Sequence, residues 1–255
     1  MKVLVAIPAR YASTRFPGKP LAMLGGQSII SRVWQRVNRA HGVDDVVVAT
    51  DDERICDHVE SFAGDGGVMM TSDQHHSGTD RCGEVLQRLE RQGETYDVVV
   101  NLQGDEPFIE PSQVEALIAA FSDPAVQIAT LKTRIHSTDE LLSPNNVKVV
   151  CAADGRALYF SRQPIPYRRG VDQAQWLDQG EYFKHVGIYA FRSEVLHEVC
   201  RLAPAPLEES EKLEQLRWLA AGYSIQVLET PHANIGIDTP EDLAAAEQSM
   251  KEHNC

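Results

Sequence analysis

The chain has 255 residues, enough to bury the core of one α/β domain. Its net charge of -13 and pI near 5.1 argue against a general nucleic-acid binder, because an acidic surface repels phosphate backbones. No apolar run approaches the roughly 20 residues that cross a bilayer, and no signal peptide precedes the first predicted strand. We therefore expect a cytoplasmic protein that contacts neither nucleic acid nor membrane.

The cysteines are odd in number and widely scattered, with no C-x-x-C pair and no histidine at metal-ligand spacing. This pattern predicts free thiols in a reducing compartment. A catalytic cysteine would need an activating neighbour, which the sequence does not show. The five positions are Cys56, Cys82, Cys151, Cys200 and Cys255.

Residues 7–21 lie between an apolar run at 3–7 and a helical pattern that starts near Gln27. This predicted strand-to-helix loop contains cations, hydroxyls, prolines and a glycine, a composition suited to holding a polyanion. It fits neither the Walker spacing nor the dinucleotide fingerprint. The alternative is an ordinary basic surface loop. The side chains that favour phosphate binding are Arg10, Ser13, Thr14, Arg15 and Lys19.

Short apolar strands alternate with amphipathic helical patterns through the first half of the chain. Strands are predicted at 45–49, 68–70 and 96–102, with one helix between them that Asp51 and Asp52 can cap and another that starts at Thr79 or Asp80. This alternation predicts a parallel sheet with helices on both faces.

Asp105 follows the apolar strand 96–102 almost directly. Ligands of open α/β sheets bind beyond the carboxyl ends of the strands, so we expect Asp105 near the first loop. The structural alternative is a turn aspartate beside Gly104. Asp238 or Thr239 is predicted to cap a final helix, and capping alone would explain both residues, but the same geometry could present Asp238 to a cation shared with Asp105.

The second half of the chain is less regular. Residues 147–152 and 157–160 predict a hairpin, 182–191 a strand, and 206–221 one helix whose glutamates form a polar face. Ser193 is predicted to cap another helix. Residues 162–181 hold little that could form a core, and they predict either an acceptor-binding or subunit-contact insertion or a mobile loop. His185 and Tyr189 share a strand face, where a lone histidine is more often structural than catalytic.

A cationic loop facing carboxylates at strand and helix ends suggests nucleotidyl transfer, in which an acceptor oxygen attacks the α-phosphorus and pyrophosphate leaves. Mg²⁺ would be held by carboxylate and phosphate oxygens. No Ser/His or Cys/His dyad supplies an obvious general base. We therefore hypothesise that the metal lowers the pKa of the attacking hydroxyl.

Seven ordered motifs cover essentially the whole chain: I-P-A-R-Y-A-S-T-R-F-P-G-K-P-L (7–21), H-x-S-G-T-D-R (75–81), N-L-Q-G-D-E-P (101–107), S-R-Q-P-I-P-Y (161–167), K-H-x-G-I-Y-A-F (184–191), E-x-L-E-Q-L-R (211–217) and G-I-D-T-P-E-D-L (236–243). Together they strongly resemble the 3-deoxy-manno-octulosonate (Kdo) cytidylyltransferase family. The resemblance implies a Rossmann-like, mixed and mostly parallel sheet of the nucleotide-diphospho-sugar transferase type. It also implies one α/β domain over 1–255, with 145–192 as an acceptor-binding and dimerisation insertion.

The resemblance further implies a Mg²⁺-dependent homodimer that joins CTP and Kdo into CMP-Kdo and pyrophosphate for lipopolysaccharide synthesis. It assigns Arg10, Arg15, Lys19, Asp105 and Asp238 to catalysis, and the two aspartates to the metal. CTP would contact Arg10, Ser13, Arg15, Lys19, Ser77, Gly78, Thr79 and Arg81. The sugar acid would contact Gln103, Arg162, His185, Tyr189, Glu214 and Gln215, with Arg162 facing its carboxylate.

Three alternatives stay open. The acceptor could be 8-amino-Kdo or another sugar acid, although sialic-acid relatives carry a glycine- and serine-rich first loop in place of residues 11–16. The chain could be a catalytically silent nucleotide-binding regulator, which intact Lys19, Asp105 and Asp238 disfavour. A glycosyltransferase would need a D-x-D metal motif where Asp105-Glu106-Pro107 stands.

Overall fold

The computed structural model describes residues 1–232 and 236–252. The chain divides into two compact units, residues 1–118 with 234–255 and residues 119–233, which we call unit 1 and unit 2. We expected a single domain carrying an insertion at 145–192, and this segment lies entirely within unit 2. Its expected roles in acceptor binding and dimerisation stay predictions.

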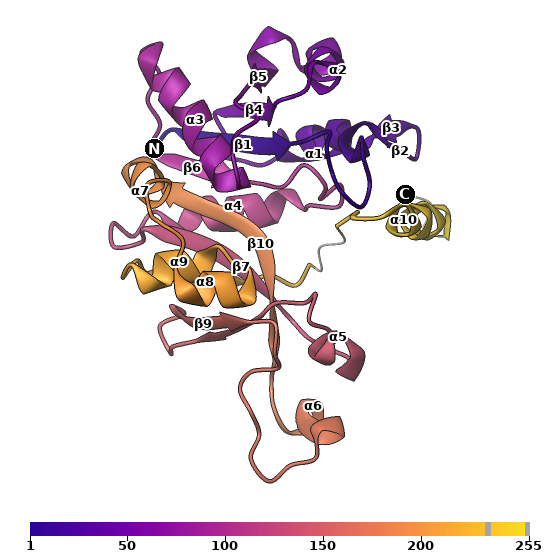
Figure 1. The fold of residues 1–255 in the computed structure, drawn as a ribbon, viewed down its shortest axis with the longest axis vertical. Coiled ribbons are helices and arrows are strands. Elements are labelled where there is room, and N and C mark those ends of the chain that lie inside the picture. The colour runs from indigo at the N-terminus through magenta and orange to yellow at the C-terminus, as the bar shows by residue number, and fades with distance from the viewer. Residues whose placement is uncertain (233–235, 253–255) are drawn as a thin grey trace. The chain divides into compact units, whose positions relative to one another are not determined.

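Unit 1 contains a parallel sheet in the order β6-β1-β4-β5 (Figure 1). Residues 3–7 of β1 are fully buried, which explains why this strand reads as an unbroken apolar run. The strands are β1 (Val3–Ala9), β4 (Asp45–Thr50), β5 (Val68–Met70) and β6 (Val98–Asn101), with a hairpin of β2 (Met23–Leu24) and β3 (Gln27–Ser28). The short 3₁₀ turns are η1 (Lys19–Leu21) and η2 (Asp65–Gly67).

Side-chain caps begin the helices that connect these strands. The helices are α1 (Ile29–Val37), α2 (Glu53–Ala63), α3 (Gly78–Arg91), α4 (Pro111–Ala120) and α10 (Pro240–Glu252), and α4 continues into unit 2. Ser28, Asp52 and Ser77 each accept a backbone N–H of the following helix. Asp52 was predicted, whereas the prediction that α3 begins at Thr79 or Asp80 was wrong by one or two residues, because Ser77 already supplies the cap.

Unit 2 has a mixed sheet. β7 (Ile128–Arg134) pairs antiparallel with β10 (Phe183–Arg192) and parallel with β11 (Ile225–Glu229). The predicted hairpin is confirmed as β8 (Lys148–Cys151) and β9 (Ala157–Ser161), and β8 also pairs with β10. With the parallel sheet of unit 1, this confirms the expected mixed and mostly parallel α/β fold class.

The helices of unit 2 are short: α5 (Thr138–Leu142), α6 (Trp176–Gln179) after the turn η3 (Gln173–Gln175), α7 (Ser193–Val199), α8 (Pro206–Glu211) and α9 (Gln215–Ala220). Two predictions are corrected here. The single helix expected over 206–221 is broken at Lys212, whose φ of 53° is left-handed. Ser193 is the first residue of α7, and Arg192 is its N-cap.

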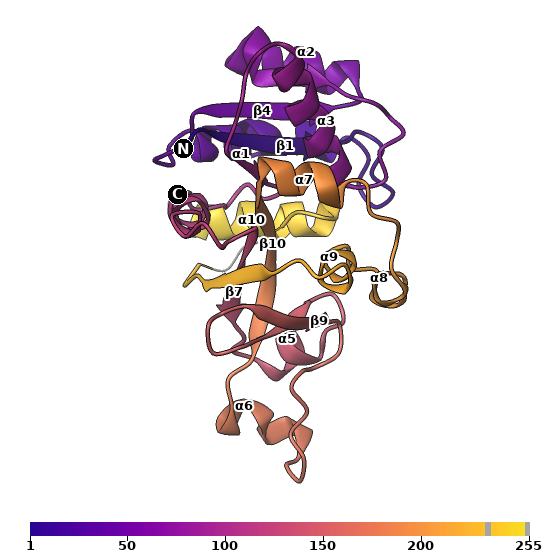
Figure 2. The ribbon, with the colours of Figure 1, turned by 90° about the vertical axis from the view of Figure 1, so that its left-hand side faces the viewer.

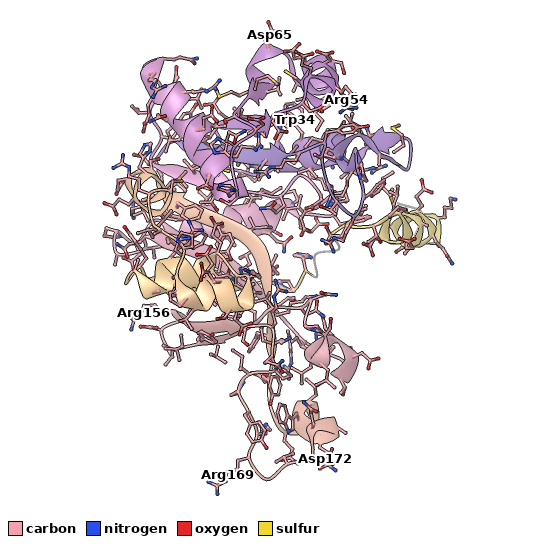
Figure 3. The ribbon with its side chains drawn as sticks, in the orientation of Figure 1. Trp34, Arg54, Asp65, Arg156, Arg169 and Asp172 are labelled. Carbon is pink, nitrogen blue, oxygen red and sulfur yellow. The ribbon has the colours of Figure 1, made fainter. Side chains whose placement is uncertain are left out.

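Residues 162–181 contribute more to packing than their composition suggests. Figure 2 shows α6 at the end of a long loop that leaves β9, and the labelled Arg169 and Asp172 stand on this loop in Figure 3. Trp176 is only 4% exposed and packs with Ile135, Leu141 and Tyr182 in a small core. The expectation of a segment with little core was therefore wrong for Trp176, because Ile135, Leu141 and Tyr182 lie outside this segment.

No disulfide joins the four cysteines within the described ranges, as expected, and Cys255 lies outside them. Burial raises the pKa of the Cys56 and Cys151 thiols, which disfavours a reactive thiolate at either position. Ile235, at the start of the last predicted segment, also lies outside the described residues. None of the helices that the structure describes combines the length and the apolar character needed to cross a bilayer.

Candidate active site

The predicted phosphate loop leaves β1 after Ala9 and closes on itself before η1. Gly18 N donates to Tyr11 O at 2.8 Å, and Gly18 has a φ of 74°, which a side chain would strain. A Cβ at Gly18 would also lie 3.1 Å from the Tyr11 ring. This closure places Lys19 at the start of η1, where only 8% of the residue is exposed to solvent.

Lys19 is the centre of an ion cluster that the loop could not form by itself. Its Nζ lies 2.5 Å from Asp105 Oδ2 and 3.0 Å from Asp238 Oδ1, and Arg15 Nη2 lies 2.9 Å from Asp238 Oδ2. Burial alone would lower the pKa of Lys19, but the two carboxylates raise it on balance. The ammonium therefore stays charged at neutral pH.

Backbone contacts bring the two aspartates together across 133 residues of sequence. After β6, Leu102 N donates to Ala6 O at 3.1 Å and Gly104 N to Pro8 O at 3.3 Å, so the chain runs beside the end of β1. A Cβ at Gly104 would lie only 3.0 Å from Pro8 O, so this close approach requires glycine. Ile237 N donates to Asp105 O at 3.0 Å and thereby fixes the neighbouring Asp238.

Asp238 is also held from the helix that follows it. Asp242 Oδ2 accepts the backbone N–H groups of Asp238 at 3.0 Å and Thr239 at 2.9 Å, while Thr239 Oγ1 accepts Asp242 N at 3.2 Å. Thr239 is thus the cap of α10, one of the two predicted candidates. The carboxylate of Asp238 is therefore free of the capping role and pairs with Lys19 and Arg15.

A cavity of about 330 Å³ opens beside this cluster, within the size range of small-ligand sites. Most of the predicted phosphate and metal residues line it, together with some that had not been predicted. The predicted residues are Arg10, Ser13, Arg15, Lys19, Ser77, Gly78, Gln103, Asp105 and Asp238. The others are Pro8, Ala9, Ala12, Pro20, His76 and Gly104.

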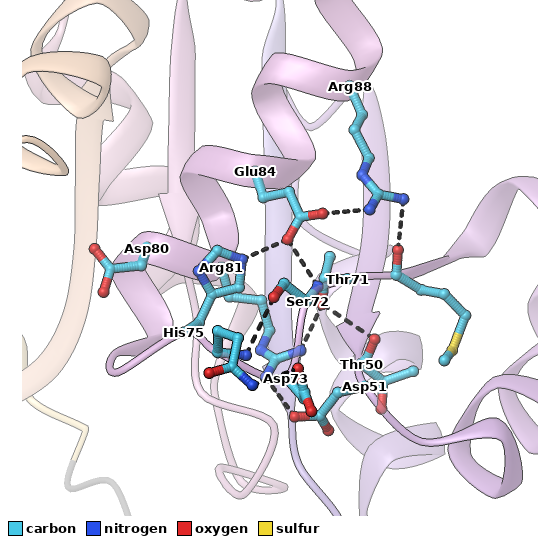
Figure 4. Close-up of polar contacts among 12 residues, drawn as sticks. Thr50, Asp51, Thr71, Ser72, Asp73, His75, Asp80, Arg81, Glu84 and Arg88 are labelled. Carbon is cyan, nitrogen blue, oxygen red and sulfur yellow. Dashed lines mark hydrogen bonds and ion pairs between the residues drawn. The ribbon is translucent and has the colours of Figure 1, made fainter.

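Two residues expected around the cytidine are not in the lining of this cavity. Thr79 is 2% exposed and accepts Asn101 Nδ2 at 3.3 Å. Arg81 is fully buried and donates to Asp51 Oδ2 at 2.7 Å and to Thr71 Oγ1 (Figure 4). In this structure both side chains form hydrogen bonds within unit 1, and their contact with CTP stays a prediction.

Gln103 lies in unit 1, whereas the other five residues expected to bind the sugar acid lie in unit 2. There, the His185 and Tyr189 rings lie 5.2 Å apart, and His185 Nε2 is 2.8 Å from Thr130 Oγ1. Burial lowers the pKa of His185 to about 3 and, aided by the nearby Glu214 charge, raises that of Tyr189 well above its ordinary value. Both rings are therefore neutral at physiological pH.

The other predicted sugar-binding residues lie nearby in the sequence. Gln215 is 4% exposed at the start of α9, and Glu214 precedes it. The Arg162 guanidinium donates to three backbone carbonyls, Glu211 O at 2.6 Å, Pro144 O at 3.0 Å and Lys212 O at 3.3 Å. Arg162 is thus fixed in place, and its predicted partnership with a substrate carboxylate stays a prediction.

Comparison with known proteins supports the same reading of the motifs. Residues 4–226 match the model of the cytidylyltransferase family. The chain is 51% identical over 250 residues to a 3-deoxy-manno-octulosonate cytidylyltransferase of Parabacteroides distasonis, covering 96% of this chain and 97% of the relative. It is 52% identical over 255 residues to the 3-deoxy-manno-octulosonate cytidylyltransferase of Bacteroides thetaiotaomicron, covering 98% of this chain and 99% of the relative. The chain belongs to the 3-deoxy-manno-octulosonate cytidylyltransferase family.

Solved structures agree. That of a CMP:2-keto-3-deoxy-manno-octonic acid synthetase complexed with CTP has a TM-score of 0.90 at 42% identity, covering 99% of this chain and 100% of that one. A 4-diphosphocytidyl-2C-methyl-D-erythritol synthase from Anaerococcus prevotii has a TM-score of 0.61 at 16% identity, which shows the shared fold alone. The resemblance inferred from the motifs is confirmed.

For a member of this cytidylyltransferase family, the donor set fits a magnesium ion. The structure shows no group of three His, Cys, Asp or Glu residues suited to a metal within the described ranges. Mg²⁺, however, is commonly held by one or two carboxylates, with phosphates and waters completing its shell. Asp105 and Asp238 both direct a carboxylate oxygen at one cation, Lys19 Nζ, and these oxygens are of the type that Mg²⁺ prefers.

Two residues that contact or anchor the cavity-lining segments, His75 and Glu84, were not predicted from the sequence. His75 accepts Arg10 Nη2 with its carbonyl, and its ring contacts Glu84. His75 stands in a recognised motif, but Glu84 is seven residues after Ser77 on a helix and carries no local signal. Only the fold brings it to the loop.

Proposed function

We propose that this protein catalyses the transfer of CMP from CTP to Kdo, with Mg²⁺ as its cofactor. The Kdo anomeric oxygen forms a bond to the α-phosphorus, the bond from that phosphorus to the bridging oxygen breaks, and pyrophosphate leaves. The convergence of Lys19, Asp105 and Asp238 beside the cavity supports this function, because one site then offers both phosphate and metal ligands.

The cations of unit 1 supply the electrostatic part of catalysis. Lys19 and Arg15 balance charge on the β- and γ-phosphates, and Arg10 lies nearer to the transferred phosphoryl group. Because Lys19 is buried, its charge acts in a poorly screened site and is worth more than in water. Asp105 and Asp238 would hold the metal, which when bound would polarise the phosphates and lower the pKa of the anomeric hydroxyl.

Uncharged polar side chains of unit 2, including His185 and Tyr189, are suited to the hydroxyl groups of the sugar acid. With its pKa near 3, His185 cannot act as an acid at physiological pH, but its ring can exchange hydrogen bonds with sugar hydroxyls. We assign it to binding, together with Tyr189, Gln215 and Arg162. We further propose that the enzyme is a cytoplasmic homodimer that supplies activated Kdo for lipopolysaccharide synthesis, as the family resemblance implies.

A substrate panel tests this function. Each of the four nucleoside triphosphates is combined with Kdo, 8-amino-Kdo or sialic acid in the presence of Mg²⁺, and pyrophosphate release is measured. We expect turnover with CTP and Kdo, and none with sialic acid. Preference for 8-amino-Kdo would redirect the assignment within the family. Binding of CTP without any pyrophosphate release would instead identify a regulator.

A further inference from the structure

The loop from Thr71 to Ser77, which connects β5 to α3, is anchored by one carboxylate that lies outside the cavity lining. Glu84 of α3 accepts the backbone N–H of Ser72 at 2.9 Å, and the same oxygen, Oε2, contacts His75 Nε2 (Figure 4). Its other oxygen pairs with Arg88 Nη2. Glu84 therefore fixes two points of this loop, and its side chain is only 14% exposed.

His75 links this anchor to the predicted phosphate loop. Its ring contacts Glu84, while its backbone carbonyl accepts a hydrogen bond from Arg10 Nη2. Arg10 lines the cavity, as do His76, Ser77 and Gly78 directly after His75. A shift of His75 would therefore move both an acceptor of Arg10 and one wall of the cavity.

The beginning of the loop is fixed independently. Thr71 N and Thr71 Oγ1 both contact Thr50 O, at 2.7 and 3.0 Å, and the buried Arg81 donates to Thr71 Oγ1 and Asp51. With this end held by β4, Glu84 fixes the next part of the loop through Ser72 and His75.

The acceptor of Arg10 matters for its charge. A carbonyl oxygen orients the guanidinium without cancelling its positive charge, whereas a carboxylate would neutralise it. Glu84 itself stays ionised: burial raises its pKa, but the contacts with Ser72, His75 and Arg88 lower it on balance. The carboxylate thus acts on Arg10 only through His75.

We propose that Glu84 and His75 are positioning residues, which orient Arg10 toward the triphosphate of CTP. This inference rests on the proposed function and extends it to residues that do not line the cavity. The chain of contacts runs from Glu84 through the His75 ring and carbonyl to Arg10, and every link lies in unit 1.

The test measures CTP binding by calorimetry in the full-length protein. Glu84→Gln keeps the size of the side chain but removes the charge that holds Ser72 and His75, and His75→Phe keeps a ring without Nε2. We expect each to raise the Kd for CTP about tenfold, as loss of a charge-assisted contact predicts. Asp73→Asn is the matched control, because it removes one charge from the same loop outside this chain of contacts, and its Kd should stay unchanged.

A double-mutant cycle separates positioning from general support of the fold. If Glu84 acts through Arg10, Glu84→Gln should weaken CTP binding less than about twofold in an Arg10→Met background. Equal losses of CTP affinity in both backgrounds would overturn the inference. So would an unchanged Kd for CTP in Glu84→Gln and His75→Phe. In either case, CTP binding by the wild-type protein would still support the proposed function. Absence of CTP binding by the wild-type protein would defeat both. If Glu84→Gln does not fold, His75→Phe carries the cycle.

Discussion

Lys19 Nζ lies 2.5 Å from Asp105 Oδ2, although 86 residues separate them in the sequence. The same ammonium reaches Asp238 at 3.0 Å. Lys19 thus pairs with both carboxylates to which we assign the metal, whereas its own assigned task is to bind phosphate. In the absence of CTP its ammonium and a metal ion would compete for the same oxygens, because two cations held side by side at these oxygens would repel each other.

Substituting Lys19 should separate these two tasks. In Lys19→Met, we expect Mn²⁺ used as a probe to bind at least about tenfold more tightly without CTP, since its competitor is gone. Turnover should fall about 100-fold or more, since a buried phosphate ligand is lost. Electron paramagnetic resonance measures free Mn²⁺, and pyrophosphate release measures turnover. Unchanged Mn²⁺ affinity would show that Lys19 does not compete for the metal oxygens.

The carboxylates should make the enzyme sensitive to magnesium. At limiting Mg²⁺, Asp105→Asn and Asp238→Asn should each lower turnover by about 100-fold, with partial recovery as Mg²⁺ is raised. Asp65→Asn, in η2 of unit 1 (Figure 3) and outside the cavity lining, is the charge-matched control and should keep normal kinetics. Near-normal turnover in both active-site variants would exclude these residues as the metal ligands.

Arg81 should matter for stability whatever its part in binding. It is fully buried against Asp51, so Arg81→Met leaves a half-buried carboxylate without its partner and should cost about 2–4 kcal/mol of unfolding free energy. Arg54 also pairs with an aspartate, Asp52, but on the surface, and Arg54→Met should have a much smaller effect. Urea denaturation compares the two. Equal losses would mean that the Arg81 ion pair contributes no more than a solvated one.

The left-handed residue between α8 and α9 offers a stabilising change. Lys212 has a φ of 53°, so Lys212→Gly should relieve backbone strain and add up to about 1 kcal/mol of stability. Lys212→Ala removes the same side chain but keeps the Cβ, and should give no gain. Thermal unfolding distinguishes the pair, and an equal response would attribute any change to the lysine side chain instead.

His185 should make stability depend on pH. Its pKa is near 3 in the folded protein and about 6.5 in the unfolded chain, so the unfolded state binds one more proton between these values. Its stabilising contribution is complete above about pH 6.5 and is lost as the pH falls toward 3, by on the order of 1–2 kcal/mol between pH 7 and 5.

The measurement is the difference in unfolding free energy between wild type and His185→Gln at several pH values. This difference should shrink as the pH falls. His41→Gln, at an exposed position, controls for loss of a histidine. A difference that is constant from pH 7 to 5 would mean that the His185 ring titrates alike in both states.

Local patterns determined much of unit 1. The apolar run at 3–7, the Asp52 cap and the glycine of the first loop act over a few residues, so the sequence alone predicts the strands, helices and phosphate loop that the structure contains. The later helices were less predictable. Helical periodicity did not reveal the left-handed break at Lys212, and the burial of Trp176 depends on Ile135 and Leu141, which precede its loop in the chain.

Loop composition and places at strand and helix ends identified Lys19, Asp105 and Asp238 as candidate site residues, and the family resemblance assigned their roles. Only the tertiary structure decided that the three converge, that Arg81 is committed to Asp51, and that Glu84 anchors the loop behind Arg10. The physical reason is the difference in sequence separation over which these interactions act. Propensity and capping act between neighbours, whereas ion pairing and burial depend on which distant segments the fold brings within a few ångströms.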